Sequence, residues 1–293
     1  MTNNKHTPSA EQWDIIISPK HRLLALNLAE IWHYRDLILL FVKRDFVAKY
    51  KQTVLGPLWH VIQPALTTIM SFLLFNVVAE ISTDGKNPIL FQMSGIVIWM
   101  YFSGSLLSTS NTFIHNAKIF GKVYFPRIIS PLSVLLSTLI QLGIQMALLI
   151  VTISVISAQK GTNFFGSQWY MVLPVVVIMA GLALGFGIII SSLTTKYRDL
   201  GVLVTFGVQL LMFASAVNYP LSKLEKIATK SPLAYSVVKW NPLTPLVDSF
   251  RNAMLGGPIW YSGLAYSAVF MLVVLLVGIV IFNRVEKTFM DTV

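Results

Sequence analysis

The stretch RDFVAKYKQTVLGPLW, residues 44–59, separates two different parts of this chain. The residues before it carry enough charge to be soluble, whereas most of the chain after it is apolar and uncharged. The stretch alternates charged with bulky apolar side chains and then breaks at Gly56-Pro57, a pair that interrupts a helix. A segment of this kind can lie on a membrane surface and face an aqueous partner at the same time.

The composition of the 293 residues indicates an integral membrane protein. Apolar residues make up 55% and charged residues only 12%, with a mean hydropathy of +0.69, whereas soluble domains carry about 25% charged residues. Because the chain has no cysteine, disulfides, thiol catalysis and cysteine metal sites are excluded. The net charge of +10 fits basic cytoplasmic loops rather than nucleic-acid binding, since no soluble basic domain is present.

Six uncharged stretches each exceed the roughly 20 residues that a helix needs to cross a membrane. They cover residues 52–79, 87–117, 128–159, 161–195, 200–222 and 252–283. We therefore predict an all-α integral membrane protein, because the strands of membrane β-barrels alternate over only about 10 residues. Within a transmembrane domain at 55–283, the expected spans are 58–80, 90–112, 130–157, 169–193, 200–218 and 260–283.

The distribution of basic residues predicts the orientation of the six spans. An even number of spans places both termini on one side, and that side holds fifteen Lys and Arg residues against seven on the other. The positive-inside rule therefore predicts that both termini are cytoplasmic. The cytoplasmic parts are a polar tail at 1–30, which lacks the apolar core of a secretory signal, and the C-terminus at 284–293.

Residues 31–54 show the spacing of a helix with one apolar stripe. The run Leu37–Val42 is too short to span a membrane, so we predict an amphipathic helix in the interface, with an ordinary juxtamembrane linker as the alternative. The stripe consists of Leu39, Val42, Phe46, Val47, Tyr50 and Val54.

The segment 219–259 is the one substantial external connection. Its prolines exclude a single long helix, but a short helix is expected after Asn241-Pro-Leu-Thr-Pro245 and should end at Gly256-Gly257-Pro258. Such a segment could re-enter the membrane from outside where surrounding protein protects its backbone.

No catalytic, metal-binding or cofactor-binding residue is predicted. The sequence has no G-x-x-x-x-G-K-[ST] phosphate loop, no G-x-S-x-G and no H-E-x-x-H. No charged residue lies deep within a span, which disfavours a transporter driven by its own ion gradient. Any energy for transport must therefore come from another subunit.

Polar and aromatic side chains inside the spans predict the lining of a conduit. Trp99 and Tyr101 lie near the centre of the second span, although these residue types usually mark the membrane edges. Hydroxyl and amide groups follow at Ser105, Ser108, Ser137 and Gln141. Flat rings with polar edges suit a passing sugar chain; the alternative for the hydroxyls and amides is hydrogen bonding between helices.

With these residues in place, the chain resembles the permease subunits of ABC type-2 exporters of the polysaccharide-export class, over nearly all of residues 35–285. That class handles lipid-linked O-antigen, capsule or wall teichoic acid. The most specific match is to the pattern R-D-x(4)-Y-x(4)-L-G-x-x-W. The matching residues are Arg44-Asp45, Tyr50, Leu55-Gly56-Pro57 and Trp59, together with Phe125-Pro126-Arg127, Tyr197-Arg198-Asp199, Asn241-Pro242 and Phe250-Arg251.

The resemblance implies a non-enzymatic permease in the bacterial cytoplasmic (inner) membrane. It implies a homodimer with two copies of a separate ATPase, which binds ATP and Mg, so that no cofactor is held here. The substrate would be polysaccharide on an undecaprenyl-diphosphate anchor. Export of a lipid or small molecule, and an intramembrane polyprenyl-phosphate transferase, are the alternatives. The polar tail 1–30 departs from family members that begin near the interfacial helix.

The resemblance also assigns roles to three groups of residues. Contact with the ATPase would fall to Arg44, Asp45, Lys49, Tyr50, Lys51, His115, Lys118 and Lys122. The diphosphate of the lipid anchor would meet Lys49, Lys51, Lys122 and Arg127, for which anchoring against anionic lipid is the alternative. Short helices in 219–259 would form an external gate with Trp240, Asn241, Asp248, Phe250 and Arg251.

Overall fold

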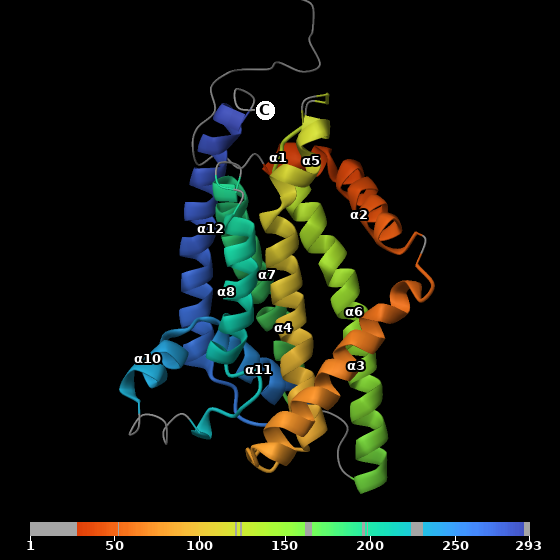
Figure 1. Ribbon diagram of the computed structural model, residues 1–293, viewed down its shortest axis with the longest axis vertical. Helices are drawn as coiled ribbons and strands as arrows, with labels where there is room; N and C mark the ends of the chain where they lie inside the picture. Colours follow the sequence, from red (N-terminus) through yellow and green to blue (C-terminus); the bar gives the residue numbers. More distant parts are fainter. Residues whose placement is uncertain are drawn as a thin grey trace, which may run out of the picture.

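The computed structural model describes residues 28–51, 53–120, 122–123, 125–161, 166–194, 197, 199–223 and 231–289. Every regular element in these ranges is a helix, which confirms the predicted all-α class. Long helices run up and down the bundle, and short helices lie at its two ends (Figure 1). The predicted polar tail falls almost entirely outside the described residues.

Five helical stretches are long and apolar enough to cross a membrane, in agreement with five of the six predicted spans. The first begins with the short turn η1 (Gly56–Leu58), continues as α3 (Trp59–Ser71) and ends in the π-helix η2 (Phe72–Val78). The others are α4 (Pro88–Ser110), α6 (Ile129–Lys160), α7 (Val172–Thr194, preceded by η3, Trp169–Met171) and α12 (Tyr261–Phe289).

The sixth predicted span, 200–218, differs from the other five. Its helix α8 (Leu200–Ala214) has 15 residues and is therefore only about 22 Å long, against a hydrocarbon thickness of about 30 Å. Residues 215–218 continue from it without helical structure and are almost completely buried. Figure 1 shows α8 running from the end near α5 toward α10 and α11. A buried non-helical segment thus follows the short helix in this predicted span.

Helix α4 forms the centre of the bundle. It packs against α3, α6, α7, α8 and α11, and 78% of its most apolar stretch is buried, compared with 17–39% in the other four candidate spans. Close approach of α7 depends on glycine: a Cβ at Gly187 would lie 2.5 Å from Cβ of Thr109 on α4. The other side of α7 packs on α12.

The first pass ends in the π-helix η2, whose hydrogen bonds join residues five apart. The amide of Ala79 donates to the carbonyl of Leu74, five residues earlier. In this turn, the side chain of Asn76 accepts a hydrogen bond of 2.9 Å from Nε2 of Gln92 on α4. The turn therefore joins the first two passes by a polar contact inside the bundle.

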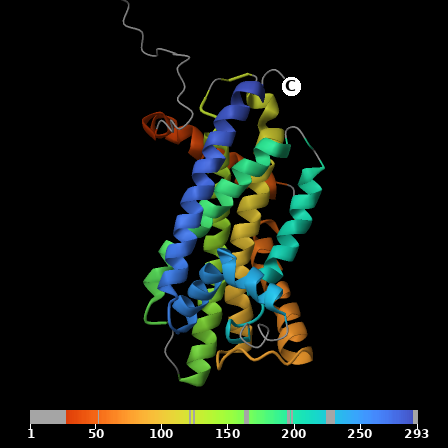
Figure 2. The same cartoon turned by 90° about the vertical axis from the view of Figure 1, so that its left-hand side faces the viewer.

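The two ends of the bundle carry different short helices. One end holds α1 (Leu28–His33), α2 (Arg35–Tyr50), α5 (Thr112–Phe120) and the end of α12, whereas α10 (Pro232–Trp240) and α11 (Leu243–Leu255) lie at the other (Figure 1 and Figure 2). The predicted short external helix is α11. It ends at Gly256, whose φ of +82° favours glycine, as predicted.

Helix α2 has apolar residues on two faces rather than in the single predicted stripe. Phe41 and Val42 are buried, and α2 packs on α6, while Leu39 and Val47 are exposed. The helix ends at Tyr50, so Val54 lies outside it and is fully exposed. The prediction of a one-sided helix over 31–54 was wrong. It assumed that the apolar residues of this helix would contact only the membrane, whereas α2 also packs on α6.

Candidate functional site

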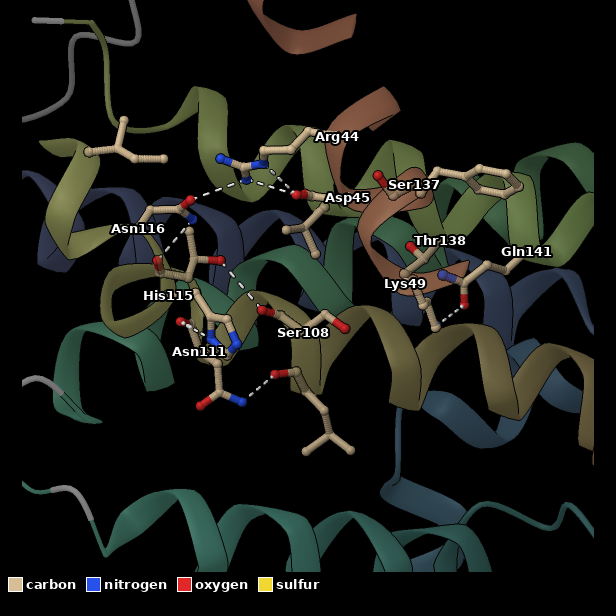
Figure 3. Close-up of a pocket in the computed structure, with 15 residues that line it drawn as sticks. Arg44, Asp45, Lys49, Ser108, Asn111, His115, Asn116, Ser137, Thr138 and Gln141 are labelled. Carbon is tan, nitrogen blue, oxygen red and sulfur yellow. Dashed lines mark hydrogen bonds and ion pairs between the residues drawn. The ribbon is translucent and has the colours of Figure 1, made fainter. Parts of the chain in front are cut away.

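A cavity of about 540 Å³ lies at the end of the bundle that holds α1, α2 and α5. Its wall is formed by α2, by the junction of α4 and α5, and by α6 (Figure 3). Most of the side chains that line it are polar. They are Arg44, Asp45, Phe46 and Lys49; Leu107, Ser108, Asn111, Thr112, His115, Asn116 and Ile119; and Val134, Ser137, Thr138 and Gln141.

Arg44 connects α2 to α5 at one side of the cavity. Its guanidinium lies 2.8 Å from Oδ1 of Asp45 and donates to Oδ1 of Asn116 at 3.2 Å (Figure 3). The same group lies 4.4 Å from the centre of the Phe41 ring. Because Asp45 offsets its charge, the pair adds little net charge to the cavity.

Lys49 connects α2 to α6 and supplies the positive charge of the cavity. Its Nζ donates to Oε1 of Gln141 at 3.3 Å (Figure 3). Among the described lining residues, it is the one lysine or arginine without a carboxylate within 4.0 Å. Partial burial lowers the pKa of Lys49 from its ordinary value. A neutral amide partner leaves this ammonium able to bind an anion.

The break between α4 and α5 supplies the third wall. Asn111 lies between the two helices and donates to the carbonyl of Leu107 at 2.9 Å, while Nδ1 of His115 lies 3.3 Å from the carbonyl of Asn111. Asn111 and Asn116 were not singled out from the sequence. A pair of asparagines at the end of an apolar run, where a helix must stop, was the available signal.

Two predicted groups of residues meet at this cavity. Arg44, Asp45, Lys49 and His115 were predicted to contact an ATPase, and Ser108, Ser137 and Gln141 to line a conduit. Ser105 lies elsewhere: its hydroxyl is 2.7 Å from that of Thr138, a buried bond between α4 and α6. For Ser105 the alternative of interhelical hydrogen bonding therefore holds.

Trp99 and Tyr101 fill the core of the bundle and do not line the cavity. Their exposed fractions are 5% and 2%, and the Trp99 ring lies 5.5 Å from that of Phe102. Helices surround α4 on several sides, so aromatic residues at its middle pack against other side chains. The structure therefore does not support the prediction that these two residues line a conduit.

The remaining predicted cytoplasmic residues lie outside the cavity lining. Tyr50 packs edge-on against His60, with ring centres 5.4 Å apart. Lys51 and Lys122 are exposed, and the Arg127 guanidinium lies 5.8 Å from the centre of the Phe120 ring. The side chain of Lys118 is outside the described part of the chain.

The predicted external gate residues have separate positions at the opposite end. Phe250 and Arg251 are buried, Asn241 precedes α11 and accepts a 2.9 Å bond from the amide of Leu243, and Trp240 is exposed. Asp248 accepts a 2.9 Å bond from Asn252. Burial raises the pKa of the Asp248 carboxyl.

Lys86 was missed at this end, because an isolated lysine in a loop gives no sequence signal. Its Nζ donates to Oδ1 of Asn252, which joins the loop before α4 to α11. Burial lowers the pKa of Lys86.

The model of the ABC-2 type transporter family matches residues 36–255, from the start of α2 to the end of α11. The chain belongs to this family. It is 25% identical to the O-antigen export system permease protein RfbA of Klebsiella pneumoniae, over 87% of this chain and 94% of that protein. It is 29% identical to RfbA of Myxococcus xanthus, over 76% and 81%. To the polysialic acid transport protein KpsM of Escherichia coli, it is 22% identical over 85% and 93%.

Proposed function

We propose that this chain is the permease subunit of an ATP-driven exporter that moves lipid-linked polysaccharide across the bacterial cytoplasmic membrane. Membership of the ABC-2 type transporter family supports the transport function. The matched permeases, named for O-antigen export and polysialic acid transport, support the class of substrate. The single observation that carries the proposal is the polar cavity, which lies where α2 packs against transmembrane helices.

The cavity has the chemistry of a site for a sugar joined to phosphate. Hydroxyl and amide side chains both donate and accept hydrogen bonds, as the hydroxyl groups of sugars do. The Lys49 ammonium, held by the neutral Gln141 amide, is a point charge suited to phosphate. In our proposal Lys49 contacts the diphosphate of the anchor, and Ser108, Ser137 and Gln141 face the first sugar.

The basic residues outside the cavity act earlier in this scheme. Lys51, Lys122 and Arg127 attract anionic groups at the cytoplasmic face, whether of lipid or of the diphosphate anchor. Both chain termini lie on this face, as the excess of Lys and Arg predicts. The anchor would then reach Lys49 between α2 and α6.

The energy comes from a separate ATPase that binds ATP and Mg, and two permease chains act as a homodimer with two ATPase copies. The ATPase docks on α2 and α5. Arg44 links α2 to α5 and Lys49 links α2 to α6, so a displacement of α2 changes the cavity. ATP binding is thereby coupled to the release of the anchor.

A complementation experiment tests this proposal. Cells that lack this gene are expected to lose surface polysaccharide and to accumulate lipid-linked polymer inside, and the wild-type chain restores export. Lys49→Met restores little export, whereas Lys43→Met, at a lysine of the same helix that does not line the cavity, restores it almost fully. Normal surface polysaccharide in the deletion strain would refute the export function. Full activity of Lys49→Met would refute the role of Lys49 in binding the anchor but would leave the export function standing.

A further inference from the structure

The end of α8 poses a specific physical problem. Residues 215–218 are non-helical and almost completely buried, and a backbone without water must find its hydrogen-bond partners within the protein. Side chains of other elements supply these partners. Asn241 donates to the carbonyl of Ala214, the last residue of α8, and to the hydroxyl of Ser215, both at 2.9 Å. Gln92 on α4 donates to the carbonyl of Asn218 at 3.2 Å.

Arg251 supplies the partners for the middle of this segment. From α11, its Nη2 donates to the carbonyls of Val217 at 2.6 Å and Ala216 at 3.4 Å. Its Nε donates to the carbonyl of Phe91 on α4 at 3.3 Å, and the guanidinium lies 3.6 Å from the centre of the Phe91 ring. One side chain therefore holds three elements together.

The charge of Arg251 is stabilised by backbone carbonyls and, from beyond ion-pair distance, by the carboxylates of Asp248 and Asp84. It is 1% exposed, and no carboxylate among the described residues lies within 4.0 Å of it. The carbonyls of Ala216 and Val217 that it binds follow the C-terminus of α8, where the helix dipole favours a positive charge. Burial lowers the pKa of Arg251 to about 10, so it remains charged at neutral pH.

The neighbouring helix leaves space for this contact. A Cβ at Gly95 of α4 would lie 2.6 Å from the carbonyl oxygen of Val217 and 2.7 Å from Nη2 of Arg251. Any larger residue at position 95 must displace the guanidinium or the segment. On the same helix, a Cβ at Gly104 meets nothing within 4 Å.

We propose that Arg251 is a positioning residue that fastens the non-helical end of the fifth pass to α11, so that α8, residues 215–218 and α11 move as one unit. Asn241 and Thr244, at the start of α11, also bind the end of α8. The attachment to α11 thus has two points. The idea that this attachment serves transport rests on the proposed export function, whereas the existence of the attachment does not.

The absence of cysteine from the sequence permits a direct test with single thiol reporters. Val217→Cys and Val175→Cys are matched, because both valines have an exposed fraction of 0%. Labelling by N-ethylmaleimide in membranes is measured with Arg251, Arg251→Met and Arg251→Lys. We expect the thiol at position 217 to react about tenfold faster or more with Arg251→Met, because unpaired carbonyls favour local opening. The thiol at position 175 should stay protected.

Three results would overturn the attachment. The first is a position-217 thiol that stays protected in Arg251→Met. The second is an equal increase at position 175, which would mean that Arg251 supports the whole bundle. The third is equal labelling in the Met and Lys variants, which would mean that the side chain acts by volume. We expect the Lys variant to be intermediate, because lysine keeps the charge but not the planar fork.

A second variant keeps the test decisive if Arg251→Met does not fold. Gly95→Ala is expected to expose the thiol at position 217 while Gly104→Ala does not; equal labelling in the two would contradict the proposal. Surface polysaccharide in the same cells then tests movement as one unit. If Arg251→Met increases labelling of the position-217 thiol without lowering export, then movement of α8, residues 215–218 and α11 as one unit is not needed for transport, and that claim is wrong. Labelling needs no substrate, so it remains informative even if export is not the function.

Discussion

Arg44 and Arg251, at opposite ends of the bundle, hold their guanidinium groups in different ways. The Arg44 side chain is 37% exposed, pairs with Asp45 and faces an open cavity. Arg251 is 1% exposed and binds backbone carbonyls and an aromatic ring. An incoming anion can replace a carboxylate on a partly hydrated arginine, whereas carbonyls of a buried segment cannot leave without exposing that segment. The cavity end is therefore suited to exchange of ligands and the α11 end to holding backbone.

The largest expected effect is on the stability of the α11 end. Arg251→Met leaves the carbonyls of Ala216 and Val217 without this donor, and each unpaired buried group costs about 1–3 kcal/mol. The carbonyl of Phe91 also loses Arg251 but keeps the hydroxyl of Ser94. Arg44→Met should cost less than about 1 kcal/mol, because partly exposed ion pairs contribute little. Thermal unfolding of the purified chain measures both. Equal losses would remove the distinction between the two ends.

A smaller effect is expected from the glycine that makes room for Arg251. Gly95→Ala should destabilise the chain by about 1–3 kcal/mol through overpacking. Gly104→Ala, on the same helix, should be neutral or stabilise it by up to about 1 kcal/mol, since alanine favours helix. The same unfolding measurement applies, and a neutral Gly95→Ala would mean that the space around Arg251 is larger than the contact distances indicate.

The long helices and α11 could be predicted because a long apolar run and a Gly-Gly-Pro ending are local properties of a sequence. The broken end of α8 could not. Its uncharged run 200–222 reads like any other span, and the donors that allow the helix to stop early come from Gln92 and Arg251, far away in the chain.

The sequence predicted residues of the cavity as two separate groups, one contacting an ATPase and one lining a conduit, and did not predict that they meet, for a similar reason. The residue types were found, but Lys49 and Gln141 meet only because α2 packs on α6. Trp99 and Tyr101, in contrast, were predicted to line a conduit but lie in the core of the bundle. A mid-membrane aromatic can face a conduit or a core, and the composition of α4 alone does not distinguish a central helix from a peripheral one.

At the cavity end, Asp45→Asn tests whether Arg44 can bind an anion, and here a gain rather than a loss is expected. The change leaves Arg44 charged and without its carboxylate, so the cavity gains net positive charge. We expect the affinity for inorganic diphosphate to rise by about fivefold, or about 1 kcal/mol. Isothermal titration calorimetry measures it, with Asp36→Asn, an exposed acidic residue on the same helix, as the control. Unchanged affinity in Asp45→Asn would place the anion away from Arg44.

The smallest expected effect concerns pH. Because partial burial lowers the pKa of Lys49, its ammonium loses its proton at a lower pH than a fully hydrated lysine does. Diphosphate binding should therefore weaken as pH rises toward the ordinary lysine range, and Lys49→Arg should remove this decrease, since arginine stays charged. The stability of the fold should change in the opposite direction. Because the folded state disfavours the charged form of Lys49, the free energy of unfolding should increase as pH rises and the ammonium loses its proton. An identical pH profile in Lys49→Arg would assign the binding to another group.

The π-helical turn at Phe72–Val78 has a consequence for the evolution of this chain. Such a turn holds one residue more than the same length of α-helix needs. Loss of one residue within it would leave the register of α3 and α4 unchanged and would sacrifice the contacts of Asn76 with Gln92 and with the carbonyl of Ile81. A deletion elsewhere in α3 would rotate the rest of that helix by about 100°. In alignments of relatives, a one-residue difference in the first pass is therefore expected at 72–78.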